Sequence, residues 1–103
     1  ICATVVRVPV LYGHSESVYV EFEKDVEIYK LCNVLKKAAA VKYSEKYMTP
    51  YDLKNSNDSH VSRVRHAFNE HSIQFWCVAN NVRLGAATNA VKIMKYMMDN
   101  CTG

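Results

Sequence analysis

Apolar and polar residues alternate along the first quarter of the chain in a way that predicts strands. Residues 1–11 are rich in β-branched side chains, but Pro9 interrupts them, which predicts an edge strand or a bulged strand. A Gly-His pair supplies a turn at His14, and strict alternation over residues 17–23 predicts a half-buried strand. Its inward side chains would be Val18, Val20 and Phe22. The pattern therefore predicts a β-hairpin over residues 5–24, with His14 at its corner.

The spacing of apolar residues then changes to that of an amphipathic helix over residues 26–39. Asp25 is suited to the N-cap position, and Glu27 falls in the first turn, where a carboxylate is favourable. The apolar positions of this helix are Ile28, Leu31, Cys32, Leu35 and Ala39. Residues 40–43 are expected to form a short strand.

The second half of the chain predicts a loop, a hairpin and a final helix. Residues 44–59 are polar and show no periodicity, and a loop of this length usually has a function. Residues 61–68 and 73–79 are strand-like and predict an antiparallel hairpin with Trp76 in its second arm. Residues 85–100 are helical by composition. The order predicts an α+β fold with a predominantly antiparallel or mixed sheet, helices on one face and a C-terminal helix.

Composition limits the classes of protein that fit this pattern. The 103 residues, half of them apolar, correspond to one domain with a modest core. Thirteen basic and ten acidic side chains give a net charge of +3 without a dense basic cluster, which argues against nucleic acid as a partner. The sequence has no apolar run that could span a bilayer and no signal-peptide pattern, so no membrane association is expected. The chain also begins without Met, which suggests that the natural polypeptide starts upstream.

The four cysteines, which are widely spaced, predict reduced thiols in a cytoplasmic protein. They are Cys2, Cys32, Cys77 and Cys101. Three histidines have no metal-ligand spacing to a cysteine or carboxylate, so no metal site is predicted. They are His60, His66 and His71.

Two residues near the N-terminus are candidates for a functional site. His14 has the side chain that most often carries protons at neutral pH, although an ordinary surface histidine would occupy the same position. Its ring could be oriented by Glu16, Glu21 or Glu23. Arg7 interrupts a run of valines, where an unpaired guanidinium would be costly to bury. Either the other face of that strand is solvated, or Arg7 binds a carboxylate or phosphate.

Further candidates have simpler explanations. Asn80 and Asn81 precede the final helix and could donate to a bound nucleotide, but N-capping is the better explanation from the sequence alone. Three arginines are consistent with a solvated face or an interface: Arg63, Arg65 and Arg83. Three methionines of the final helix are expected to pack in the core or in an interface: Met94, Met97 and Met98.

Two long motifs closely resemble the C-terminal half of bacterial-type aspartate-semialdehyde dehydrogenases. They read TVVRVPVLYGHSESVYVEFEK over residues 4–24 and FWCVANNVRLGAATNAVKI over residues 75–93. The segments TPYD at residues 49–52 and VSRVR at residues 61–65 are also similar to that family. The resemblance covers essentially the whole chain.

The resemblance implies a fold, an activity and partners. The family's enzymes reduce β-aspartyl phosphate to aspartate β-semialdehyde with NADPH, at the branch toward lysine, threonine, methionine and diaminopimelate. Their N-terminal Rossmann domain binds NADP, and their C-terminal α/β domain, of the glyceraldehyde-3-phosphate-dehydrogenase-like type, carries the dimer interface. Residues 1–103 would form part of this catalytic and dimerisation domain. A homodimer or a dimer of dimers through the sheet is therefore implied.

The resemblance also assigns roles to three residues. His14 matches the general acid/base histidine, and Arg7 matches the arginine that binds the substrate carboxylate. Asn81 matches a residue that lines the nicotinamide side of the site. Three positions depart from the family pattern, which usually has Asp, Lys and Gly there: Asn80, Leu84 and Ser62.

Two parts of the family's machinery are missing from these 103 residues. No cysteine stands in the Asn-Cys context of the catalytic nucleophile, and the three glycines do not form the Gly-rich dinucleotide turn. The sequence therefore predicts a C-terminal segment that is inactive alone. The alternatives are a non-catalytic α+β dimerisation module and a segment of N-acetyl-γ-glutamyl-phosphate reductase.

Overall fold

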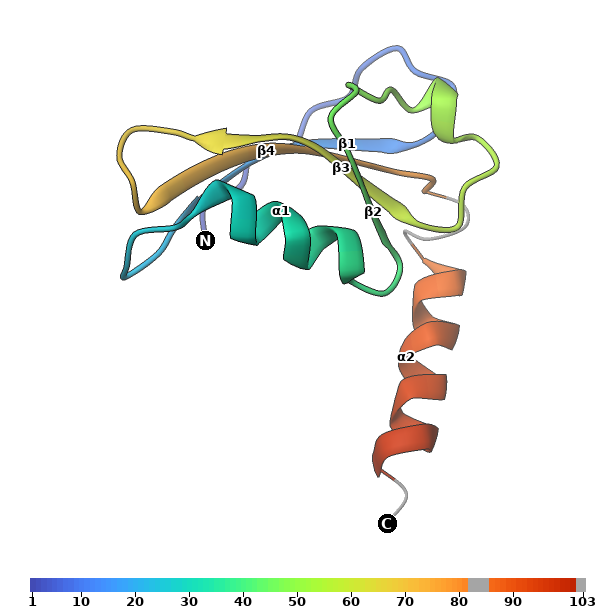
Figure 1. Ribbon diagram of the computed structural model, residues 1–103. Coiled ribbons are helices and arrows are strands. Elements are labelled where there is room, and N and C mark those ends of the chain that lie inside the picture. The colour runs from blue at the N-terminus through green and yellow to red at the C-terminus, as the bar shows by residue number, and fades with distance from the viewer. Residues whose placement is uncertain (82–85, 102–103) are drawn as a thin grey trace.

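The computed structural model describes residues 1–81 and 86–101, and in this part of the chain a four-stranded sheet carries the fold (Figure 1). Its strands lie in the order β1-β4-β3-β2. Their bounds are β1 His14–Glu21, β2 Val41–Ser44, β3 Ser59–His66 and β4 Ser72–Ala79. β4 runs antiparallel to β1 and β3, whereas β2 runs parallel to β3. The predicted α+β class with a mixed sheet is confirmed.

β3 and β4 form the antiparallel hairpin that the sequence predicts. Trp76 lies in its second arm, where the indole Nε1 donates a hydrogen bond to the Met48 carbonyl at 3.0 Å. The pairing register shifts between Ser62 and Arg65, and Arg63 adopts a φ of 57° there. This irregularity has the features of a β-bulge, which bends the strand at that point.

The helix α1 (Ile28–Lys37) lies on one side of the sheet, over β2 and β3, while the loop between β2 and β3 lies on the other side (Figure 1). Cys32 is the buried residue of α1. A hydrogen bond between Cys32 and the Tyr43 hydroxyl, together with burial, raises the pKa of Tyr43 to about 12. This contact attaches the helix to β2.

α1 is shorter than the predicted helix over residues 26–39, and Asp25 is not its N-cap. Glu27 occupies the N-cap position in an extended conformation, without a side-chain capping bond. The reason lies in the preceding residue, because the Val26 N–H donates to the Glu70 carbonyl at 2.9 Å. This bond holds the chain at residue 26 against the β3-β4 turn, and the helix begins after it.

The predicted hairpin over residues 5–24 is wrong. Residues 1–11 form no strand, and their large apolar side chains are exposed. At Pro9 the chain makes a tight turn, with the Val10 N–H donating to the Val8 carbonyl at 2.8 Å. β1 pairs instead with β4, which places His14 at the end of an edge strand rather than at a hairpin corner.

The alternation over residues 17–23 is largely correct, because β1 covers most of it. Val18 and Val20 are half-buried, opposite Phe75 and Ile73 of β4. Phe22 is 40% exposed, against expectation, because it lies beyond the end of the strand. Alternation predicts which side chains share a face, but it does not specify the partner strand.

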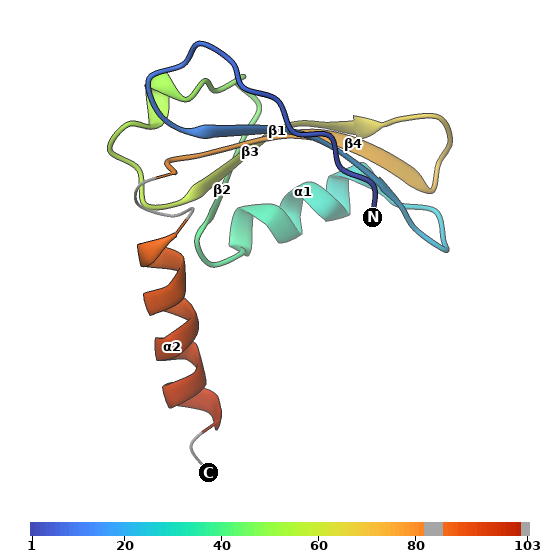
Figure 2. The same cartoon turned by 180° about the vertical axis from the view of Figure 1, so that it is seen from behind.

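The C-terminal helix α2 (Ala87–Cys101) extends away from the sheet (Figures 1 and 2). Near its start Lys92 Nζ donates to the Asn57 carbonyl at 2.9 Å and lies 3.7 Å from Asp58 Oδ1. The predicted helix over residues 85–100 is therefore confirmed from residue 87, while residue 85 lies outside the described residues. Among the described residues no helix has the length and apolar character needed to cross a membrane.

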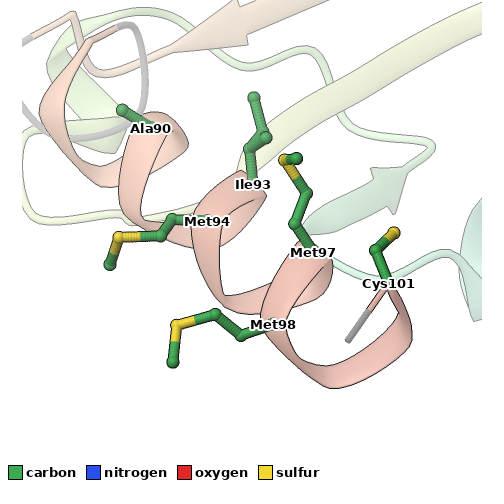
Figure 3. A pocket seen from close by; sticks show the side chains of 6 residues that line it. All are labelled: Ala90, Ile93, Met94, Met97, Met98 and Cys101. Atoms are coloured by element: carbon green, nitrogen blue, oxygen red, sulfur yellow. The ribbon is translucent and has the colours of Figure 1, made fainter. Parts of the chain in front are cut away.

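An apolar stripe runs along α2 and lines an open hollow (Figure 3). It consists of Ala90, Ile93, Met94, Met97, Met98 and Cys101. The three methionines are each more than half exposed, so the interpretation that they pack in a core does not hold for the part of the chain described here. Packing in an interface remains a prediction.

Candidate functional site

A glycine with an unusual backbone conformation places His14 at the start of β1. Gly13 has a φ of +98°, which L side chains rarely adopt. A Cβ on Gly13 would lie 2.7 Å from the Pro50 Cβ and 3.3 Å from the Ala79 carbonyl oxygen. His14 then pairs with Ala79 at the end of β4. The local fold therefore requires glycine immediately before the histidine.

Asn81 is attached to the same turn. Its Oδ1 accepts a hydrogen bond from the Gly13 N–H at 2.8 Å. Because Asn81 follows the end of β4 by two residues, this bond extends the β1-β4 contact beyond its last strand pair. Two of the three predicted site residues, His14 and Asn81, thus lie at one corner of the sheet.

His14 lines a cavity of about 590 Å³ whose walls are part polar and part apolar. Its sheet wall consists of alternate residues of β1 and β4, namely His14, Glu16, Cys77 and Ala79. The rest of its lining comes from the turn between α1 and β2, from the starts of β2 and β3, and from α2: Ala39, Ala40, Val41, Ser59 and Asn89. Imidazole, carboxylate, hydroxyl and amide groups therefore line one space, which suits a small polar ligand.

Cys77 is unsuited to be the nucleophile of this cavity. Burial, with a smaller contribution from the charge of Glu16, raises the pKa of the Cys77 thiol above its usual value. A nucleophilic cysteine needs the opposite shift, since the thiolate is the reactive form. The raised pKa therefore disfavours the thiolate form of Cys77 at neutral pH.

The three carboxylates that could orient the His14 ring are now distinguishable. Glu16 lies on the same face of β1 as His14 and lines the same cavity. Glu21 lies 3.6 Å from His71 Nε2, at the far end of the strand. Glu23 follows the end of β1. Glu16 is thus the carboxylate best placed to act on His14.

Arg7 is not brought into the His14 corner by any interaction in the described part of the chain. Arg7 lies in the segment that precedes β1, and its side chain is exposed. Among the described residues, its guanidinium has neither a hydrogen-bond acceptor nor an ion-pair partner. A solvated guanidinium remains available to an anion. Its predicted role as the carboxylate-binding residue stays a prediction.

Pro50 belongs to this corner, although no separate role was predicted for it. The short 3-10 helix η1 (Tyr51–Leu53) begins immediately after it. Thr49 donates to Asp52 Oδ2 from both its backbone N–H, at 2.8 Å, and its Oγ1, at 2.7 Å. This bonding holds the turn that presses Pro50 against Gly13, and the spacing Thr-Pro-x-Asp is the signal that could have revealed it.

The opposite face of the sheet carries a row of polar side chains between two aromatic pairs. Across the strands, Arg65 Nη2 donates to Gln74 Oε1 at 2.7 Å, and Gln74 Nε2 donates to Ser17 Oγ at 3.3 Å. The aromatic pairs are Tyr19 with Phe68 and Tyr47 with Trp76, each with ring centroids 5.7 Å apart. This open face consists of Ser17, Tyr19, Tyr47, Arg63, Arg65, Phe68, Gln74 and Trp76.

Comparison with known proteins gives the family of this chain. Residues 1–84 match the family described as semialdehyde dehydrogenase, dimerisation domain. The chain belongs to this family. The matched region contains β1 to β4, α1 and the whole corner around His14. It ends before α2 begins.

Relatives of the semialdehyde dehydrogenase family extend the comparison. The chain is 38% identical to aspartate-semialdehyde dehydrogenase from Campylobacter jejuni over 105 residues, which are 96% of this chain and 31% of that protein. The chain is also 38% identical to aspartate-semialdehyde dehydrogenase from Aquifex aeolicus, and the alignment covers 95% of this chain and 31% of that protein. The chain therefore spans about three tenths of the length of the curated relatives it matches.

Solved structures support the same family. Aspartate semialdehyde dehydrogenase II from Vibrio cholerae has a TM-score of 0.80 at 34% identity, covering 91% of this chain and 29% of that one. A second structure of that protein is described as complexed with ASA. A probable aspartate-semialdehyde dehydrogenase from Pseudomonas aeruginosa also has a TM-score of 0.80, at 28% identity. This alignment covers 89% of this chain and 29% of that one.

Proposed function

We propose that this chain is the C-terminal catalytic and dimerisation segment of an NADP-dependent aspartate-semialdehyde dehydrogenase. The whole enzyme would reduce β-aspartyl phosphate to aspartate β-semialdehyde in the cytoplasm, for lysine, threonine, methionine and diaminopimelate biosynthesis. The observation that carries the proposal is the position of His14. It follows a glycine turn and lines a cavity with several polar groups, inside the 84 residues that match the family.

His14 would act as the general acid and base. As base, its imidazole accepts the proton of a cysteine thiol while the sulfur attacks the acyl carbon of the substrate and phosphate leaves. After reduction of the thioester, the imidazolium returns a proton to the hemithioacetal as it collapses to aldehyde and thiol. The thiol would come from upstream of this segment, because none of its four cysteines stands in the Asn-Cys context of the family's nucleophile. The segment alone is therefore expected to be inactive.

Arg7 would bind the carboxylate of the amino-acid substrate. A guanidinium can hold a carboxylate with two parallel hydrogen bonds, which fixes its orientation as well as its position. The exposed side chain of Arg7 is compatible with this role. Holding the substrate in one orientation raises the rate by removing its rotational freedom before the reaction.

NADP would contact this segment at Asn81 and be bound mainly by an upstream Rossmann domain. When bound, NADPH supplies the hydride. The fit is limited to the nicotinamide side: Asn81 offers an amide donor beside the His14 turn, whereas these 103 residues contain no Gly-rich loop for a pyrophosphate. We assign residues 1–103 to the catalytic and dimerisation domain, and the match of residues 1–84 to the dimerisation-domain family supports this assignment.

The open face of the sheet would form the homodimer interface. It combines large aromatic side chains with two arginines, Arg63 and Arg65, a composition that is typical of interface centres. α1 covers the other face, so two copies could associate through their sheets without displacing it. The family description as a dimerisation domain supports this proposal.

The test is phosphate-dependent NADPH formation from aspartate semialdehyde by the full-length protein. His14→Ala should lower kcat by about 10²-fold or more, because a positioned proton carrier contributes that much. His71→Ala is the matched control, since that ring lies at the far end of β1 near Glu21. Arg7→Ala should raise the KM for the semialdehyde. Unchanged kinetics in His14→Ala would refute the assignment of His14.

The substrate assay also separates the alternatives. Activity with the N-acetyl-γ-glutamyl analogue and none with aspartate semialdehyde would indicate the related reductase. A wild-type protein that forms dimers but reduces neither acyl phosphate would be the non-catalytic module instead.

A further inference from the structure

Asn81 joins two segments that lie 68 positions apart in the sequence. The hydrogen bond fixes the orientation of its amide group, because the Gly13 N–H can only donate and must face an oxygen. The Nδ2 group therefore points the other way. Within residues 1–81 and 86–101 it has no hydrogen-bond acceptor. One end of the Asn81 amide is thus engaged with the His14 turn, and the other end remains available as a donor.

This bond closes an otherwise weak corner. The last strand pair of β1 and β4 is His14 with Ala79, and β1 is an edge strand with one unpaired side. Ends of edge strands open readily because few contacts hold them. Gly13 packs against Pro50 from one side, and the Asn81 bond fixes it from the other.

We propose that Asn81 is a positioning residue for His14, in addition to its proposed contact with nicotinamide. Its Oδ1 holds the Gly13 turn and thereby the imidazole that follows, while Nδ2 serves the cofactor. Placement of the proton carrier and contact with the cofactor then depend on one side chain. The kinetic part of this inference rests on the proposed function, whereas the part concerning the turn does not.

Two variants of Asn81 distinguish the role of its Oδ1 from the role of its Nδ2. Asn81→Asp retains an oxygen for the Gly13 N–H and removes the Nδ2 donor. Asn81→Leu removes both at a similar side-chain volume. Asn55→Leu, at an exposed position in the loop before β3, is the matched control. All are made in the full-length protein, and thermal unfolding identifies any variant that fails to fold.

The first readout is amide hydrogen exchange of the peptide containing Gly13 and His14, measured without cofactor. Exchange should be about tenfold faster in Asn81→Leu, and wild-type-like in Asn81→Asp and Asn55→Leu. Equal exchange in Asn81→Leu and wild type would overturn the inference. This readout decides the matter even if the protein lacks dehydrogenase activity, so failure of the proposed function is distinguishable.

The second readout is the split between kcat and KM. Asn81→Leu should lose about 10- to 100-fold in kcat, because a small misplacement of a reacting group costs that much. Asn81→Asp should retain kcat within about threefold and show its main defect as a raised KM for NADP. If both variants changed only the KM for NADP, Asn81 would be a cofactor contact without a positioning role.

Discussion

Two serines are completely buried in the sheet, and their hydroxyl groups are in opposite situations. Ser72 Oγ accepts hydrogen bonds from the N–H groups of Phe68 and Asn69, at 3.1 and 3.2 Å, and donates to the Asn69 carbonyl at 3.3 Å. Ser62 Oγ has no hydrogen-bond partner among the described residues. The family to which this chain is similar usually has glycine at this position. The serine therefore places a hydroxyl group in a buried site that glycine would leave without one.

Truncating these two serines should therefore change stability in opposite directions. Ser62→Ala removes a buried polar group that lacks compensation and should raise the free energy of unfolding by about 1 kcal/mol. Ser72→Ala should lower it by about 1–2 kcal/mol, because it leaves two backbone N–H groups of the turn without an acceptor. Urea unfolding of both variants measures the difference. A loss of stability in Ser62→Ala would contradict this reading.

At the scale of elements, the parts of the fold that depend on local signals could be predicted. The β3-β4 hairpin was predictable because its strands are adjacent and Ser72 organises the short turn between them. The partner of β1 was not predictable, because β4 lies more than fifty residues away and alternation carries no information about partners. In the same way His14 could be proposed from its motif, whereas the hydrogen bond between Gly13 and Asn81 required the fold.

The turn before η1 should make stability depend on pH. The two hydrogen bonds from Thr49 lower the pKa of Asp52 below its ordinary value of 3.8. A lowered folded-state pKa means that the ionised carboxylate stabilises the native state at neutral pH, and that this contribution is lost as the pH falls through the lowered pKa.

Replacement by asparagine isolates this charge. Asp52→Asn should unfold at a lower urea concentration than wild type at pH 7, because the charge-assisted bonds become neutral ones. The two unfolding midpoints should converge below pH 3.8, where the wild-type carboxyl group becomes protonated as well. Midpoints that differ equally at every pH would show that the charge of Asp52 does not contribute.

At the scale of the whole molecule, the sheet separates three surfaces with different properties. The His14 cavity opens on the side that α1 covers, the open face lies on the other side, and α2 extends away from both (Figures 1 and 2). A second copy that covers the open face would therefore leave the His14 cavity accessible. Dimerisation and catalysis can thus occupy opposite sides of one four-stranded sheet.

This separation gives the last prediction. Arg65 lies on the open face, where it is bonded to Gln74 and lines one hollow with Arg63, so Arg65→Glu would reverse a charge there and remove the bond to Gln74. If two copies meet through this face, the variant should weaken the dimer by at least about tenfold in Kd, because the Arg65–Gln74 bond is lost and the new carboxylate lies against the Gln74 amide oxygen that Arg65 bonded. Lys37→Glu, at the exposed end of α1, makes the same change of charge on the opposite side and should leave the dimer intact. Sedimentation velocity of the full-length variants measures the outcome, and a dimer that tolerates Arg65→Glu as well as Lys37→Glu would place the interface elsewhere.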